Sequence, residues 1–213
     1  MAPHGRPVTE PHGLFVTLEG GEGVGKSTLQ TALAARARAI GLEVVTCREP
    51  GGTPLGERLR AALFESADGE TDPTAELLVF EAARAQLVAD LIRPALHRGA
   101  LVICDRFADS SIAYQHHGRG LPAHVVSSLN DIATGGLVPN LTILLDLDPA
   151  EGARRRGDAG DYLEREAAAF HARIRAGFLS LATAEPGRWL VVDATQSPDA
   201  VADIAWDAVN ARR

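Results

Sequence analysis

Five short apolar runs alternate along the chain with longer segments that are rich in Ala, Leu and Arg. The runs are 14–19 (LFVTLE), 42–47 (LEVVTC), 100–105 (ALVICD), 141–146 (LTILLD) and 188–193 (RWLVVD). Hydrophobicity that is continuous within each run is typical of strands that are buried on both faces. Strands that alternate with helices predict a doubly wound α/β fold, in which helices cover both faces of a five-stranded parallel sheet.

The segments between the runs predict helices at 27–40, 55–64, 74–96, 123–134 and 162–184, with a closing helix at 201–211. Ser197 and Pro198 suit the N-cap and the first position of the closing helix. A chain of 213 residues is within the range of one large domain. We therefore predict a single domain over 14–213, and a flexible extension over 1–13, which is polar and broken by prolines.

The composition narrows the classes of protein that the chain can belong to. Its 21 Lys and Arg against 28 Asp and Glu give a net charge of −7, which argues against a general nucleic-acid surface. No apolar run approaches the length of a membrane span, and the N-terminal segment lacks the apolar core of a secretory signal. Cys47 and Cys104 each end an apolar run, so we expect buried, reduced thiols in a cytoplasmic protein.

In a doubly wound sheet, ligands bind at the carboxyl ends of the strands. The residues that end or directly follow the runs are mostly charged, among them Glu19, Arg48, Glu49, Asp105 and Asp146. A structural loop needs no such charges, so we expect the functional site at this edge of the sheet.

The segment after the first run matches the phosphate-binding loop pattern, from Gly20 through Gly25, Lys26 and Ser27, between a predicted strand and a predicted helix. Backbone N–H groups and the helix N-terminus would hold the phosphates. Lys26, the only lysine of the chain, would reach the outer phosphates, and the Ser27 hydroxyl would ligate Mg²⁺. The residues assigned to the phosphate donor are Gly20, Gly21, Glu22, Gly23, Val24, Gly25, Lys26, Ser27 and Thr28.

Asp105 ends the third run, where a second acid would hold the metal ion through water. Arg106 follows it and can bind a second phosphate with two parallel hydrogen bonds. The sequence has no HRD-type motif that would supply a base for a substrate hydroxyl. A phosphate monoester needs no base, because it is largely dianionic at neutral pH. These residues favour phosphoryl transfer onto a phosphate by positioning and charge neutralisation.

The segments FVTLEGGEGVGKST, REPGGTPLGERLR, LLVFEAARAQL, DRFADSSIAYQ and PNLTILLD together resemble the bacterial thymidylate kinases, a family of P-loop nucleoside monophosphate kinases. The resemblance runs from residue 14 to about residue 193. It implies a P-loop NTPase fold with a lid, ATP as the phosphoryl donor with Mg²⁺, dTMP as the acceptor, and a homodimer.

The resemblance also assigns residues to the acceptor nucleotide. It implies that Phe80 stacks on thymine and that Arg84 hydrogen-bonds the base, and their i, i+4 spacing places both on one helix face. Without the family, Phe80 is equally well explained as a core residue. Tyr114 matches a tyrosine that disfavours a ribose 2′-hydroxyl. The remaining matches are Arg48, Arg60 and Arg106 around the phosphate and sugar, Ser111 and Gln115 near the base, and Glu49, as a second acid or as a residue that orients Arg48.

Glu22 places a carboxylate inside a loop that is built to hold phosphates. The backbone N–H groups of such a loop point inward, so its side chains can point away. In the family the acid at this position faces the acceptor nucleotide, near the sugar 3′-hydroxyl and the arginines of its phosphate. The alternative is a solvent-facing Glu without a role.

A short lid is expected at about 152–161, where the sequence departs from the family pattern. Arg154, Arg155 and Arg156 are consecutive, so on a helix they point in different directions and at most two can reach the nucleotide. We assign Arg156 to the transferred phosphate; the alternative is a solvated basic end of a helix at 149–155. Glu164 matches the lid glutamate of the family.

Two other functions stay open from the sequence. One is a related kinase for another nucleotide or for a nucleoside, in which Glu49 would be the candidate base. The other is a nucleotide-binding regulator whose altered lid has lowered its turnover.

Overall fold

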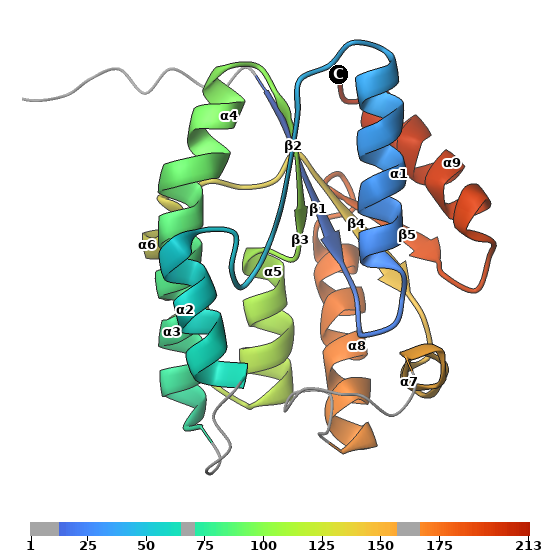
Figure 1. Ribbon diagram of the computed structural model, residues 1–213. Coiled ribbons are helices and arrows are strands. Elements are labelled where there is room, and N and C mark those ends of the chain that lie inside the picture. The colour runs from blue at the N-terminus through green and yellow to red at the C-terminus, as the bar shows by residue number, and fades with distance from the viewer. Residues whose placement is uncertain (1–12, 65–70, 157–166) are drawn as a thin grey trace, which may run out of the picture.

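The computed structural model describes residues 13–64, 71–156 and 167–213, built around a parallel sheet in the order β2-β3-β1-β4-β5 (Figure 1). The strands are β1 (Leu14–Glu19), β2 (Val44–Arg48), β3 (Leu101–Asp105), β4 (Leu141–Asp146) and β5 (Trp189–Asp193). Every neighbouring pair is parallel, so the predicted five-stranded sheet is confirmed. Three strands begin later than their runs, β2 at Val44, β3 at Leu101 and β5 at Trp189, and β2 ends one residue later, at Arg48.

The strand order places a topological switch point between β1 and β3. After β1 the chain crosses to β2 on one side of the sheet, and after β3 it crosses to β4 on the other side. The loops that follow β1 and β3 therefore diverge and leave a crevice at the carboxyl ends of these strands.

Nine α-helices surround the sheet in the described part of the chain. They are α1 (Lys26–Ala39), α2 (Pro54–Phe64), α3 (Pro73–Leu87), α4 (Arg93–His97), α5 (Ala108–Ser111), α6 (Ala123–Thr134), α7 (Pro149–Arg156), α8 (Ala168–Ala184) and α9 (Pro198–Asn210). Figure 1 shows α1 and α9 side by side on one face, whereas α3, α4 and α8 lie on the other.

The packing of the core explains why each strand is a continuous apolar run in the sequence. Val16 and Leu18 of β1 pack against α1 and α9, whereas Phe15 points to the opposite face and packs with β3 and α4. Successive side chains of a strand point to opposite faces, so burial on both faces requires apolar residues at both parities. Cys47 and Cys104 are buried free thiols, as predicted.

The helix predicted at 74–96 is interrupted. After α3 the chain forms a π-helix, η1 (Val88–Ile92), before α4. Pro94 lacks a backbone N–H and cannot continue regular α-helical bonding from the preceding turn. In that wider turn the Arg93 N–H donates to the carbonyl of Val88, five residues earlier.

One helical segment was not predicted. It follows β3, where α5 and a second π-helix, η2 (Ile112–Gly118), lie. The closing helix begins at Pro198 with Ser197 as its N-cap, as predicted, and the Ser197 hydroxyl accepts from the Ala200 N–H at 3.3 Å. Within the described residues, no helix has the length and apolar character needed to cross a membrane.

Candidate active site

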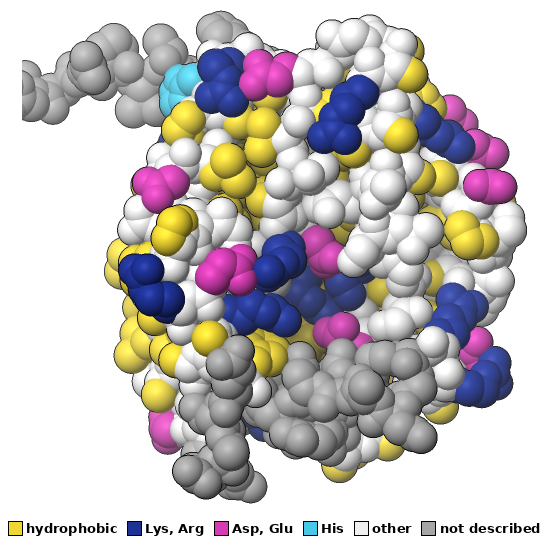
Figure 2. Space-filling view, viewed as in Figure 1, with side chains coloured by type: hydrophobic (Ala, Val, Ile, Leu, Met, Phe, Trp, Pro, Cys, Tyr) yellow, Lys and Arg dark blue, Asp and Glu magenta, His cyan; other side chains and the backbone are white. Residues whose placement is uncertain are grey.

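A cavity of about 440 Å³ lies at the carboxyl ends of β1, β2 and β3. Its walls come from the loop after β1, the segments after β2 and β3, and helices α2, α3 and η2. Figure 2 shows basic and acidic side chains gathered around this hollow. The cavity is therefore at the crevice that the strand order creates.

The loop between β1 and α1 follows a path that requires glycine. Gly20 and Gly23 have φ values of 134° and 70°, and a Cβ atom would lie 2.5 Å from the Leu145 carbonyl at the first and 2.2 Å from the Gly152 carbonyl at the second. Gly25 caps α1 in the left-handed region, with φ 99°. The loop thus approaches β4 and α7 more closely than any side chain would permit.

Lys26 lies over this loop. Its Nζ donates to the carbonyls of Gly21 at 2.7 Å and Gly20 at 3.3 Å, and the side chain is buried. Burial and the neighbouring Arg106 lower the pKa of Lys26. The ammonium group is thus held beside the N-terminus of α1, where both its charge and the helix dipole attract an anion.

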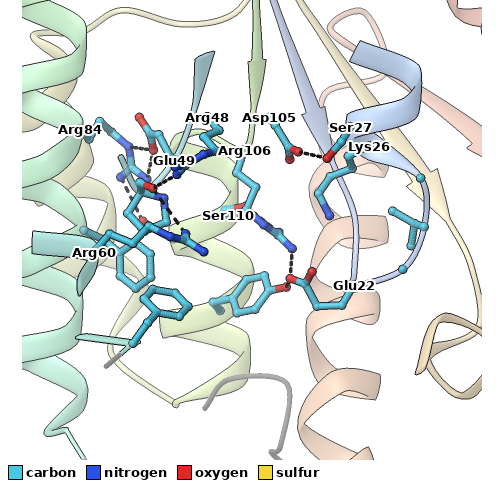
Figure 3. A pocket seen from close by; sticks show the side chains of 18 of the residues that line it. Glu22, Lys26, Ser27, Arg48, Glu49, Arg60, Arg84, Asp105, Arg106 and Ser110 are labelled. Atoms are coloured by element: carbon cyan, nitrogen blue, oxygen red, sulfur yellow. Dashed lines mark hydrogen bonds and ion pairs between the residues drawn. The ribbon is translucent and has the colours of Figure 1, made fainter. Parts of the chain in front are cut away.

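Ser27 and Asp105 bring two oxygen ligands together, because the Ser27 hydroxyl donates to Asp105 Oδ2 at 3.3 Å (Figure 3). A hydroxyl and a carboxylate suit a hard cation such as Mg²⁺, which usually keeps water and phosphate oxygens as its other ligands. In the described part of the chain, no group of three or more His, Cys, Asp or Glu side chains could hold a metal ion. The pair therefore fits an ion that substrate phosphates help to bind.

Glu22 turns from the phosphate loop toward the cavity (Figure 3). Its Oε1 accepts from Arg106 Nη2 and from the Tyr114 hydroxyl at 3.2 Å. The Arg106 guanidinium also lies over the Tyr114 ring, 4.9 Å from its centroid. Burial alone would raise the pKa of Glu22, but the positive charges of Arg106 and Lys26 outweigh it and hold the pKa at about 2. Glu22 is therefore ionised throughout the neutral range.

Arg106 has a backbone conformation that is rare for a residue with a side chain, with φ 70°. Glu19, which is fully buried, holds the residues that follow. Its carboxyl oxygens accept from the Phe107 N–H at 2.8 Å and the Ser110 hydroxyl at 2.6 Å. Ser110 in turn accepts from Arg106 Nη1 at 3.3 Å. Burial and the nearby Asp109 raise the pKa of Glu19 to about 8.

Arg84 is buried at one wall of the cavity, with 1% of its surface exposed. Acceptors surround every N–H of its guanidinium: Glu49 Oε2 at 2.8 Å, Glu81 Oε1 and Asn130 Oδ1 at 2.6 Å, Ser111 Oγ at 3.0 Å and the Phe107 carbonyl at 3.2 Å. Burial raises the pKa of Glu49 to about 7, although Arg84 opposes the shift. For Arg84 to contact a nucleobase, it would have to exchange one of these partners.

Arg48 and Arg60 also line the cavity. Arg48 Nη2 bonds both carboxylate oxygens of Glu57 at 3.0 Å, whereas Glu49 pairs with Arg84. The alternative that Glu49 orients Arg48 is therefore wrong. Arg60 lies over the Phe64 ring, 4.4 Å from its centroid.

Comparison with known proteins agrees with this geometry. The family model described as Thymidylate kinase matches residues 18–204. The chain is 52% identical to a thymidylate kinase of Deinococcus radiodurans, over 94% of this chain and 98% of that protein, and 48% identical to one of Solidesulfovibrio magneticus, over 92% and 98%. The chain belongs to the thymidylate kinase family. A crystal structure of thymidylate kinase from Ehrlichia chaffeensis superimposes with a TM-score of 0.78 at 33% identity, covering 92% of this chain and 98% of that one.

The pocket of this thymidylate kinase family member brings together most of the residues that the sequence assigned. Among them are Lys26, Ser27, Asp105, Arg106, Phe80, Tyr114 and Gln115. Gly20 and Gly21 lie on the other side of the phosphate loop, beside a second cavity of about 220 Å³. Asp146 also borders that cavity and pairs with Arg175 at 2.7 Å, so it does not join the site.

The lid residues contribute less to the described structure. Arg154 and Arg155 both pair with Glu151, and neither lines the main cavity. The side chain of Arg156 lies outside the described residues, as does Glu164. The assignment of Arg156 to the transferred phosphate thus stays a prediction.

Sequence reasoning missed Glu81 and Asn130, which both accept hydrogen bonds from Arg84. It placed Glu19 at the edge of the site but did not predict that Glu19 holds the segment after Arg106. Glu76 precedes Phe80 and Arg84 at four-residue spacing, which is a usable signal for one helix face. Asn130 comes from α6, and no local pattern connects it to Arg84.

The raised pKa of Glu19 predicts a measurable dependence of stability on pH. A carboxyl group whose folded-state pKa exceeds its unfolded value of 4.5 stabilises the fold below that value, and this stability is lost as pH rises toward about 8. Glu19→Gln cannot ionise. The free energy of unfolding of Glu19→Gln, measured by urea titration, should therefore rise relative to that of the unchanged protein as the pH increases. Between pH 5 and 8 the difference should grow by a few kcal/mol, at ~1.4 kcal/mol per pKa unit.

The control is Glu43→Gln, which removes an exposed carboxylate that pairs with Arg98 at 2.8 Å. Its curve should stay parallel to that of the unchanged protein. A Glu19→Gln curve that is equally parallel would contradict the buried, proton-binding role of Glu19.

Proposed function

We propose that this protein is a thymidylate kinase, which transfers the γ-phosphate of ATP to dTMP and gives dTDP and ADP. The observation that carries the proposal is a single cavity that joins a phosphate loop with Lys26 to a second cationic group, Arg106, and to an aromatic wall at Phe80. One cavity with two phosphate-binding ends suits a phosphate donor and a phosphate acceptor. Membership of the thymidylate kinase family supports the choice of acceptor.

The chain supplies positioning and positive charge. The backbone N–H groups of the loop and Lys26 would hold the donor phosphates, and Arg106 would hold the acceptor phosphate facing them. Because both phosphates are anionic, bringing them into line requires that their charges be neutralised. An acceptor that is already ionised needs no general base.

Ser27 and Asp105 are the residues that we propose for Mg²⁺, and their oxygen atoms, 3.3 Å apart, fit this hard cation. The ion would supply charge neutralisation on the transferred phosphoryl group. ATP and Mg²⁺ are thus the proposed donor and cofactor.

Glu49 is the candidate base that a nucleoside kinase would need for the sugar hydroxyl. Its Oε2 accepts from Arg84 at 2.8 Å, the side chain is buried, and its Oε1 has no partner among the described residues. Membership of the thymidylate kinase family favours the nucleotide kinase over this alternative. Cys47 and Cys104 remain free thiols, which suits the reducing cytoplasm where we propose that the reaction occurs.

The function is tested by measuring ADP formation with dTMP, dUMP, dCMP and thymidine as acceptors. We expect dTMP to give the highest kcat/KM. Lys26→Ala should lower kcat by roughly a hundredfold or more with dTMP, because a preorganised charge at the transferred phosphate is lost while the fold is retained. Equal rates with all four acceptors, or no dTDP in a single-turnover experiment at saturating substrates, would contradict the proposal; the second result would indicate a nucleotide-binding regulator.

Glu22 gives a second prediction. Its carboxylate bonds Arg106 and Tyr114, on the acceptor side of the loop. Glu22→Ala should therefore raise the KM for dTMP several-fold and leave the KM for ATP nearly unchanged. Lys26→Ala, measured in parallel, should instead impair the use of ATP. Equal effects of Glu22→Ala on both substrates would show that Glu22 acts on the donor as well.

A homodimer is a further part of the proposal. Leu78 on α3 and Ile132 on α6 are 50% and 77% exposed, although both are large and apolar, and α3 packs on α6. Exposed apolar side chains on neighbouring helices are typical of surfaces that bind another protein.

Ile132→Asp should convert a dimer to a monomer in sedimentation velocity experiments, because it places a charge in an apolar interface. Ile40→Asp is the matched control: Ile40 is 54% exposed at the end of α1, and its replacement should leave the dimer intact. A dimer that survives Ile132→Asp would place the interface elsewhere.

A further inference from the structure

The side-chain amide of Gln115 lines the cavity and is held by a buried carboxylate. Gln115 Nε2 donates to Glu76 Oε1 at 2.8 Å, and the two residues are 2% and 0% exposed. Gln115 belongs to η2, whereas Glu76 belongs to the first turn of α3. Glu76, Phe80 and Arg84 are spaced four residues apart, so they share the face of α3 that borders the cavity.

Glu76 accepts hydrogen bonds and has none to give. Arg119 Nη2 donates to its second oxygen, Oε2, at 3.0 Å, so Glu76 and Arg119 form an ion pair. An ionised carboxylate carries no hydrogen. The amide of Gln115 must therefore turn its NH₂ group toward Glu76, and its carbonyl oxygen is directed away from that carboxylate.

The carbonyl oxygen of Gln115 is available as an acceptor at the cavity wall. Among the residues that the structure describes, none donates to Gln115 Oε1. Arg84, on the same wall, differs in this respect, because every N–H of its guanidinium faces a protein acceptor. Gln115 is thus a neutral amide on this wall whose orientation is fixed and whose acceptor oxygen has no donor among the described residues; the other such acceptor, Glu49 Oε1, belongs to the carboxylate that pairs with Arg84.

A fixed hydrogen-bond acceptor such as the Gln115 carbonyl can distinguish pyrimidine bases by whether N3 carries a hydrogen. Thymine and uracil carry an N3–H, whereas cytosine carries a lone pair there. We propose that Glu76 is a specificity-determining positioning residue: by holding the Gln115 amide in one orientation, it makes the site accept a pyrimidine with an N3–H and reject one with an N3 lone pair. This inference rests on the proposed function, because it places a pyrimidine nucleotide in this cavity.

The site would discriminate against cytosine because two hydrogen-bond acceptors, the Gln115 carbonyl and cytosine N3, would face each other. If cytosine occupied the cavity, the Gln115 carbonyl and N3 would both lose water and gain no donor. Sites that are built to hydrogen-bond a substrate N–H reject analogues that lack it far more strongly than sites that measure shape alone. We expect the unchanged protein to prefer dTMP and dUMP over dCMP in kcat/KM by roughly a hundredfold or more.

Glu76→Gln tests the inference, since the replacement has the same shape but an amide that both donates and accepts. Gln115 could then present either end to the base. The preference for dTMP over dCMP should fall by about tenfold or more, chiefly through KM, while the KM for ATP stays the same. If all nucleotides lose activity equally and the preference is kept, Glu76 has a purely structural role and the inference is overturned.

A second variant distinguishes a loss of specificity from a folding defect caused by Glu76→Gln. Gln115→Leu keeps the Glu76–Arg119 ion pair and removes the whole amide, both the acceptor for the base and the donor to Glu76, so it should lose the same preference. Its thermal unfolding temperature shows whether loss of the bond to Glu76 also weakens the fold. Glu43→Gln is the matched loss of a carboxylate from an Arg–Glu pair elsewhere, and it should keep the full preference. A Gln115→Leu protein that still rejects dCMP would overturn the inference.

Failure of the inference and failure of the proposed function give different results. If the unchanged protein forms dTDP and both variants retain its discrimination, only the role of Glu76 is wrong. If the unchanged protein forms no dTDP from dTMP, the proposed function is wrong and the inference falls with it.

Discussion

One buried carboxyl group joins the two halves of the site. Glu19, the last residue of β1, accepts hydrogen bonds from Phe107 and Ser110 in the segment that follows β3. The phosphate loop starts directly after Glu19, and Arg106 directly precedes Phe107, so this contact fixes the phosphate loop relative to Arg106. It also helps to retain a left-handed Arg106 backbone, a conformation that costs roughly 1–3 kcal/mol. The pKa of about 8 for Glu19 reflects how completely the carboxyl group is buried.

Around this anchor, three of the guanidinium groups that line the cavity each have a carboxylate partner. Glu22 pairs with Arg106, Glu49 with Arg84, and Glu57 with Arg48. Such pairs keep the guanidinium groups oriented before any nucleotide binds, and preorganised charge is the larger part of catalysis in phosphoryl transfer. The pairs differ in exposure: Arg84 is enclosed with Glu49, whereas Arg48 and Glu57 are about half exposed. Arg84 is accordingly better suited to a structural role in the cavity wall, whereas Arg106 is more accessible to a phosphate.

Much of this arrangement could be predicted from the sequence because it depends on local patterns. Buried strands need apolar residues at both parities, and a phosphate loop needs glycines, so both are visible in short windows. The family resemblance, which the comparisons confirm, located the residues that line the cavity. The partners of Arg84 could not be predicted in this way. Glu49 and Asn130 are 35 and 46 residues from it in sequence, and no periodicity links them.

The sequence by itself determined the doubly wound sheet, the phosphate loop and the edge of the sheet where charged residues gather, because each follows from spacing within a few residues. The tertiary structure alone decided the partners and orientations of those charges. Two π-helices set the side chains of the segments that follow α3 and α5, and the wider turn of such a helix has no apolar repeat that would reveal it. Which carboxylate faces Arg84, and which end of the Gln115 amide faces the cavity, depend on contacts between elements that meet only in the folded chain.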